Sequence, residues 1–143
     1  MIYEVDVERI ESQLRYLEKC IEVINRSAAT RGELVQRFAL ERALHLAVEC
    51  MIDVGSVMID GFIMRDPGGY LDIVDILEDE KVIPPELAGK LKELVQIREK
   101  LVRYYDKLEE EALVAGRDTE VYRSFIQHVR KYLHQELGEQ ILK

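Results

Sequence analysis

Apolar residues recur along the chain at alternating steps of three and four, the spacing that places side chains on one face of an α-helix. The first such run extends from Val7 to Ile24, and Asp6 before it is a suitable N-cap. The positions that form this face are Val7, Ile10, Leu14, Leu17, Ile21 and Ile24. We therefore expect an amphipathic helix near the start of the chain.

A second, central helix is expected from near Gly32 to about Met64. This stretch contains no proline and is apolar around most of its circumference. Its polar residues recur at steps of three or four, which places them on one narrow line along the helix. The members of this polar line are Arg42, His45, Glu49, Asp53, Ser56 and Asp60. The pattern predicts a helix that is buried on every side except this line.

The clearest break in the pattern is the segment Asp66–Gly69, which contains one proline and two adjacent glycines. Proline stops a helix and paired glycines favour turns. A short helix is expected after it, from Tyr70 to about Glu80. Pro84 and Pro85 suit the first turn of another helix, which the apolar spacing extends to about Glu111.

A last helix is expected after Gly116, with Asp118 or Thr119 as its cap. Its apolar face comprises Val121, Tyr122, Phe125, Val129, Tyr132 and Leu133. Short connections between long amphipathic helices favour antiparallel neighbours. The sequence therefore predicts an all-α fold, an up-and-down helical bundle of about five helices, formed as a single domain over residues 1–143.

Composition agrees with one domain, since 143 residues with 48% hydrophobic content supply a single core. No apolar run approaches the roughly 18 residues of a membrane span, and the N-terminus lacks a leader pattern, so the expected location is cytoplasmic. Cys20 and Cys50 lie in helical apolar patterns without paired spacing. We expect buried reduced thiols, no metal and no cofactor.

The net charge of −8 argues against general attraction to nucleic acid, because clustered basic residues drive binding to phosphates. Any RNA contact must therefore be local. One local cluster exists, and it admits two interpretations, a solvated helix face or an RNA contact. Its members are Arg98, Lys100, Arg103 and Lys107.

A heptad line along the fourth predicted helix contains two residues that are unusual at such positions. The line is Leu87, Leu91, Leu94, Arg98, Leu101, Tyr105, Leu108 and Ala112, so that Arg98 and Tyr105 stand where leucine is the usual residue. An unpaired buried guanidinium is costly. Arg98 must therefore meet a carboxylate, such as one on the polar line of the central helix, a water-filled cleft or a bound anion.

The segment Arg98–Tyr105, with the sequence Arg-Glu-Lys-Leu-Val-Arg-Tyr-Tyr, resembles the RX4HXY signature of HepT-like proteins in the HEPN superfamily. Residues 37–55 resemble the central helix of that family, and residues 77–87 resemble its approach to the motif helix. The resemblance covers about residues 31–110. It implies a HEPN-like helical bundle.

The resemblance also implies a function. Members are homodimers whose motif helices line a cleft between subunits, and they act as toxins by metal-independent endoribonuclease activity on an RNA substrate. A nucleotidyltransferase antitoxin is the expected partner. The match assigns binding of the scissile phosphate to Arg98, and it makes Tyr105 the residue that the antitoxin blocks by adenylylation.

Arg103 stands where the family has its catalytic histidine. Arginine stays protonated at working pH and cannot act as a general base, although it can stabilise charge on phosphate. An acid/base pair is worth about 10²- to 10⁴-fold in rate, so a slow or inactive nuclease is expected. On an ideal helix Arg103 also lies roughly 140° from Arg98, whereas Tyr105 lies on the same side as Arg98.

Other residues offer partial substitutes. His45, His128 and His134 have no supporting motif; His45 is the most interesting because it shares the polar line with Glu49, and a structural role is its ordinary interpretation. Asp53 is a candidate to pair with Arg98 and hold its orientation. The alternative functions are a noncatalytic homodimeric module that binds RNA, a nucleotide or a partner protein, and a purely structural seam.

Overall fold

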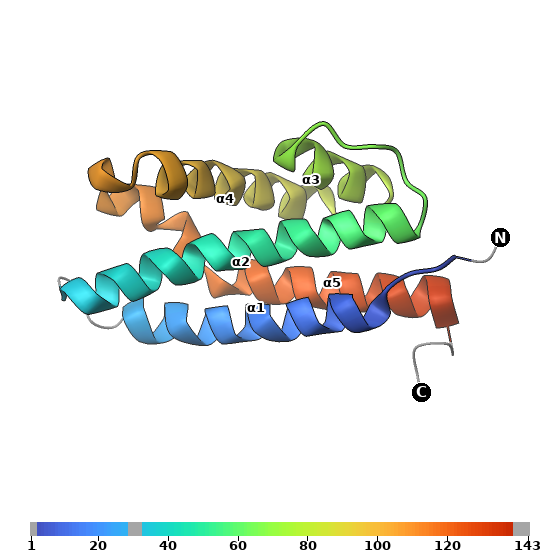
Figure 1. Cartoon of the computed structure of the whole chain (residues 1–143), viewed down its shortest axis with the longest axis horizontal. Helices are drawn as coiled ribbons and strands as arrows, with labels where there is room; N and C mark the ends of the chain where they lie inside the picture. Colours follow the sequence, from blue (N-terminus) through green and yellow to red (C-terminus); the bar gives the residue numbers. More distant parts are fainter. Residues whose placement is uncertain (1–2, 29–32, 139–143) are drawn as a thin grey trace.

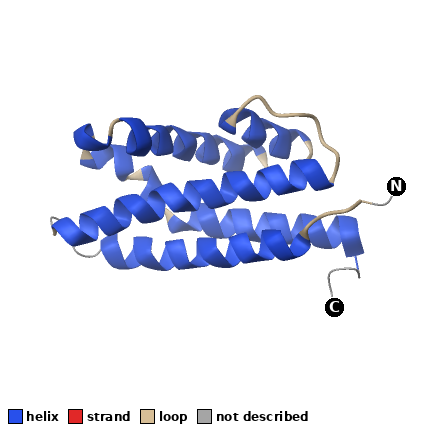
Figure 2. Cartoon of the chain, viewed as in Figure 1, coloured by secondary structure: helices blue, strands red, loops and turns tan. Residues whose placement is uncertain are grey.

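The computed structural model describes residues 3–28 and 33–138. Five α-helices lie in these ranges: α1 (Val7–Ala28), α2 (Leu34–Gly61), α3 (Tyr70–Asp79), α4 (Pro85–Arg103) and α5 (Thr119–Leu137). Three short 3₁₀ turns join α4 to α5: η1 (Tyr105–Lys107), η2 (Glu110–Leu113) and η3 (Ala115–Arg117). The described ranges contain no strand, so the predicted all-α fold is confirmed (Figure 2).

The four long helices run alternately in opposite directions along the long axis of the molecule (Figure 1). α1 packs along α2, and α5 packs against α1 and α4. The short α3 lies beside α4 at the end where α2 finishes, and it contacts both helices. This is the predicted up-and-down bundle, with α3 as a short addition to a four-helix arrangement.

α1 follows its predicted pattern. Its cap is formed by the Asp6 carboxylate, which accepts a hydrogen bond from the amide of Arg9 at 3.0 Å. Four residues of the predicted apolar face are completely buried: Ile10, Leu14, Leu17 and Ile24. The helix therefore contributes one continuous apolar face to the core, as its spacing predicts.

α2 is the central helix, and its polar line lies outside the core as predicted. The prediction that every other side is buried is wrong at the start of the helix, where Leu34, Val35 and Phe38 are exposed because no other element of the described chain covers them. It begins at Leu34, where the Glu33 carboxylate accepts hydrogen bonds from the amides of Val35 and Gln36. The predicted start near Gly32 lies outside the described residues. The helix ends at Gly61, three residues before the predicted end. α3 occupies almost its predicted range.

The predicted length of the fourth helix is wrong. α4 ends at Arg103, and Tyr104 adopts φ −124° and ψ 38°, outside the helical region. The chain then turns back so that Leu113 is completely buried and the carbonyl of Gly116 accepts a hydrogen bond from the Tyr122 hydroxyl at 2.7 Å. These core contacts override a periodic pattern that continued to residue 111. Tyr105 therefore lies on η1 rather than on the helix that carries Arg98.

Three aromatic rings close one end of the bundle. Phe62 lies between Tyr3 and Tyr132, with ring centroids 5.2 Å apart in each edge-to-face pair. This cluster joins the N-terminal segment, the end of α2 and the last turns of α5. Elsewhere in the core, the cysteines of α1 and α2 are free and buried, as predicted.

Candidate functional site

Arg98 is half-buried on α4 and faces α2. Its Nε donates a hydrogen bond to Oε1 of Glu49 at 2.6 Å. Glu49 belongs to the polar line, so one of the interpretations offered by the sequence, an ion pair between Arg98 and that line, describes the structure. A charge-assisted bond of this length fixes the guanidinium against α2.

Tyr70 completes this arrangement from α3. Its hydroxyl donates to the second carboxylate oxygen of Glu49 at 2.9 Å, and its ring lies against the guanidinium of Arg98, with the central carbon 4.3 Å from the ring centroid. The contact has cation–π geometry. Three helices thus hold Arg98 by charge, hydrogen bonding and stacking.

The surroundings change the proton affinity of both partners of Glu49. Burial lowers the pKa of Arg98, but the hydrogen bond and negative charge of Glu49 outweigh it, so the net shift is upward. Burial raises the pKa of Tyr70, and its hydrogen bond to Glu49 raises it further. Both groups therefore stay protonated, with Arg98 cationic and Tyr70 neutral.

Arg103 lies at the last position of α4, and its side chain is 68% exposed. Its Nε contacts Oε1 of Glu99 at 2.6 Å, while the other oxygen of Glu99 lies 3.8 Å from Nη1 of Arg98. One carboxylate therefore bridges the two arginines of the motif. Arg103 projects into solvent, away from the half-buried position of Arg98, as the helical geometry predicts.

Tyr105 lies on the wall of an open groove between the N-terminal half of α2 and the end of α4. The groove has a volume of about 370 Å³ and is lined by Phe38, Glu41, Arg42, His45, Leu101 and Tyr105. Tyr105 is 68% exposed. We refer to this hollow as the α2–η1 groove. It combines two aromatic rings with a guanidinium and an imidazole, groups that stack on bases and bind phosphates.

His45 connects the groove to the Arg98 network. Its Nε2 lies 3.6 Å from Oε1 of Glu49, the same oxygen that accepts from Arg98. Its Nδ1 lies 3.4 Å from Nη1 of Arg42. The predicted polar line therefore brings a histidine, a carboxylate and two arginines together.

Asp53 does not hold Arg98 as anticipated. In the described part of the chain the carboxylates paired with Arg98 belong to Glu49 and Glu99, and Asp53 is exposed one turn farther along α2. Partial desolvation of its carboxyl by the neighbouring side chains, followed by the charge of Glu49, raises the pKa of Asp53. The sequence offers Asp53 as one candidate among the carboxylates of the polar line, and it gives no signal for Tyr70 beyond the start of a helix.

The remaining basic residues of the motif region lie around a different hollow. Lys100 and Lys107, together with Tyr104 and Leu108, line an open groove with a volume of about 410 Å³. Both lysines are exposed. This surface is solvated, as one interpretation of the charge cluster expected, and it adjoins the motif without containing Arg98.

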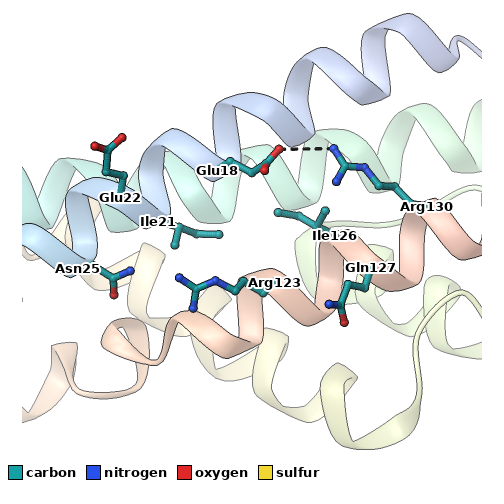
Figure 3. Close-up of a pocket in the computed structure, with 8 residues that line it drawn as sticks. All are labelled: Glu18, Ile21, Glu22, Asn25, Arg123, Ile126, Gln127 and Arg130. Carbon is teal, nitrogen blue, oxygen red and sulfur yellow. Dashed lines mark hydrogen bonds and ion pairs between the residues drawn. The ribbon is translucent and has the colours of Figure 1, made fainter.

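A larger groove of about 490 Å³ lies between α1 and α5 (Figure 3). Its two arginines are already engaged by groups of the chain itself. Arg130 contacts Glu11 and Glu18, and Arg123 contacts Thr119 and Glu120. None of the residues that line this groove belongs to the Arg98–Tyr105 segment, so it is a surface separate from the candidate site.

Two further findings bear on the kind of site. Within residues 3–28 and 33–138, no set of three or more histidine, cysteine or acidic side chains is arranged to hold a metal ion. No helix in these ranges combines the length and the apolar character needed to cross a membrane.

Solved structures of toxin–antitoxin complexes share the fold. The chain is similar to a tri-AMPylated HEPN toxin of Shewanella oneidensis in complex with an MNT antitoxin, with a TM-score of 0.79, 19% identity and coverage of 86% of this chain and 97% of that one. It is also similar to a chain of a toxin–antitoxin structure with AMP-PNP, with a TM-score of 0.81, 18% identity and coverage of 87% and 98%. At these identities the likeness establishes the HEPN-like fold.

Sequence similarity is stronger to a protein of Bacillus subtilis (strain 168) named "Putative RNase YutE". The two are 40% identical over 140 residues, which is 96% of each chain. A solved structure described as the cytosolic protein of unknown function YutE has a TM-score of 0.85 at 37% identity, again over 96% of each chain. The family model described as "Ribonuclease HepT-like" matches residues 10–131. The chain belongs to the ribonuclease HepT-like family.

Proposed function

We propose that this protein is a HepT-like toxin, a metal-independent endoribonuclease in which Arg98 binds the scissile phosphate. The observation that carries the proposal is the way Arg98 is held. Glu49 engages its Nε and Tyr70 supports its face. Nη1 lies 3.8 Å from Glu99, farther than a hydrogen bond, so both terminal nitrogens keep their donors for a phosphate. A guanidinium fixed in advance needs little reorganisation to stabilise a developing negative charge.

The proposed active form is a homodimer with a cleft between the two subunits. Exposed apolar side chains gather around the α2–η1 groove: Leu34, Val35, Phe38 and Tyr105 are each between 67% and 69% exposed. Exposed apolar side chains that lie together on a surface often mark a site of protein–protein interaction. A second copy that covers it would face its own Arg98 region toward the same cleft.

Tyr105 is the proposed target of a nucleotidyltransferase antitoxin. Its exposure leaves the phenol accessible to a modifying enzyme. An adenylate group there would add bulk and negative charge to the wall of the α2–η1 groove. Either effect would exclude RNA from the groove and so would neutralise the proposed toxin.

Arg103 replaces the motif histidine, and its proposed role is electrostatic. Held by Glu99, it adds positive charge at the end of α4 but supplies no proton acceptor. This exposed ion pair favours the second candidate function, a noncatalytic dimer that binds RNA, a nucleotide or a partner protein. The two functions differ in whether RNA is cut or only bound.

The deciding experiment incubates the purified protein with RNA in a metal chelator and follows cleavage on gels. We expect slow cutting by the natural chain, a loss of at least about 10²-fold in Arg98→Ala, and faster cutting in Arg103→His. Arg123→Ala on α5 is the matched control and should cut as the natural chain does. Binding without cleavage by all four proteins would establish the noncatalytic function instead.

A further inference from the structure

His45 is the histidine of the α2–η1 groove. It lies on the second and central helix, far in sequence from the motif, yet it shares one oxygen of Glu49 with Arg98. Tyr105 lines the same groove from η1. An imidazole that can accept a proton therefore lies close to Arg98, the proposed phosphate-binding residue. This imidazole is on α2, whereas the family motif places its histidine on the helix that carries Arg98.

The neighbours of His45 define how its ring is used. Nη1 of Arg42 can only donate, so Nδ1 of His45, 3.4 Å away, must present its lone pair on that side. The neutral ring then carries its proton on Nε2, which faces the Glu49 carboxylate at 3.6 Å. At this separation the negative charge of Glu49 favours the tautomer with the proton on Nε2 without an ordinary hydrogen bond, and it leaves Nδ1 as the base.

We propose that His45 replaces the missing motif histidine as the proton-transferring catalytic residue, with Glu49 as its positioning residue. This inference rests on the proposed ribonuclease function and deepens it. Arg42 is part of the arrangement: it is exposed at the mouth of the groove, and turning toward an RNA phosphate would release Nδ1. Binding of the substrate would thereby uncover the base.

The chemical step is a transesterification. Nδ1 takes the proton of a ribose 2′-hydroxyl, whose oxygen forms a bond to the adjacent phosphorus. The bond from phosphorus to the 5′-oxygen breaks, and that oxygen leaves with the electron pair and receives the proton back from the imidazolium. The products are a 2′,3′-cyclic phosphate and a 5′-hydroxyl, with no net change in protons. Arg98 stabilises the charge on phosphorus-bound oxygens during attack.

The charges around His45 favour its neutral form. Burial lowers the pKa of His45, Glu49 raises it, and Arg42 and Arg98 lower it again, with a net downward shift. The titratable or charged groups facing it are Glu41, Arg42 and Glu49 on α2, Arg98 on α4 and Tyr105 on η1. A neutral imidazole at neutral pH is the form that a general base requires.

The other two histidines lack these features. Nδ1 of His128 lies 2.7 Å from the carbonyl of Ser124, so that nitrogen is the donor of a bond within its own helix. His134 is exposed in the last turn of α5. Neither residue lines the α2–η1 groove. His134 is therefore a suitable control position.

The test measures cleavage of RNA in chelator by the natural chain, His45→Ala and His134→Ala, each checked for folding by circular dichroism. We expect a loss of about 10²- to 10⁴-fold in His45→Ala only. The natural chain should lose activity as pH falls through the lowered pKa of His45, and the acidic limb should vanish in the variant. Free imidazole added to the folded His45→Ala protein should restore part of the rate.

Three results would overturn the inference, and they are distinguishable. If the natural chain cuts RNA and folded His45→Ala cuts equally well with the same pH profile, the assignment of His45 is wrong and the ribonuclease proposal stands. If the natural chain does not cut RNA at all, the proposed function fails and the assignment fails with it. A structural role alone predicts lower thermal stability of His45→Ala without rescue by imidazole, which also contradicts the inference.

Discussion

The two ends of α2 differ sharply in what surrounds them. Toward the C-terminus, apolar side chains are buried on nearly every side of the helix, with Met58 completely inaccessible and Gly55 packed against α3. At the N-terminus the apolar side chains face solvent, and Phe38 is 67% exposed. The same helix therefore serves as the centre of the core at one end and as an open surface at the other.

This difference shows where the fold ends and the proposed site begins. Burial of apolar surface stabilises the C-terminal half within a single chain. The first turn of the helix, where Leu34, Val35 and Phe38 are exposed, gains little of this stabilisation, and full burial within the chain begins at Leu40. His45 and Glu49 lie between the two halves, where the packed part of the helix holds polar groups at the edge of the groove.

The largest contrast is expected between two truncations on this helix. Met58→Ala removes a completely buried side chain and should lower the free energy of unfolding by about 2–5 kcal/mol. Phe38→Ala removes an exposed ring and should change that free energy by less than about 0.5 kcal/mol in the monomer. Urea unfolding monitored by circular dichroism measures both. Equal losses would show that the two ends are equally packed.

The next contrast compares the same substitution on two helices. A Cβ at Gly55 would lie 2.7 Å from the Cγ2 methyl of Ile73, so Gly55→Ala should destabilise the protein by about 1–3 kcal/mol. A Cβ at Gly89 on α4 would meet no atom within 4 Å, and Gly89→Ala should stabilise by about 0.5–1 kcal/mol. Thermal melts of the two variants should shift in opposite directions, and shifts of the same sign would contradict the close packing of α2 on α3.

The smallest expected effect concerns His45 at the boundary. Because its pKa is lowered in the folded chain, the unfolded chain binds more protons at mildly acidic pH, and the folded state loses stability as pH falls below the ordinary histidine range. His45→Asn removes this titration. The free energies of unfolding of the two proteins should be measured from about pH 8 to about pH 5. If His45→Asn is the less stable protein, the two values should converge as pH falls, because only the natural chain loses stability through this titration. Curves with a constant separation would show that the ring titrates as in the unfolded chain.

Much of the fold could be predicted because local signals and packing agree. The spacing in α1, the Asp6 cap and the break at Asp66–Gly69 each point to the structure observed. The predicted end of the fourth helix was wrong because the apolar periodicity continues past Arg103, whereas the chain turns back there to bury Leu113. Periodicity along one segment carries no information about a distant core position that must be filled.

The candidate site could be predicted only in part. The cost of an unpaired guanidinium correctly required a partner for Arg98, but three acidic residues of the polar line satisfied that requirement equally well in the sequence. The choice of Glu49 depends on the register between α2 and α4, and the contribution of Tyr70 depends on where α3 docks. The register between two helices is set by how the whole molecule packs, so the pattern within either helix does not reveal it. His45 shared the polar line with Glu49, and the groove around it exists only after η1 folds back.

The edge-to-face cluster of Tyr3, Phe62 and Tyr132 has a practical consequence. It fastens the N-terminal segment and the last turns of α5 to the end of α2 that lies opposite the α2–η1 groove (Figure 1). A fluorophore or affinity handle introduced near either of these two segments would sit about the full length of the bundle away from the groove. Reporters placed there can follow association or RNA capture without obstructing it.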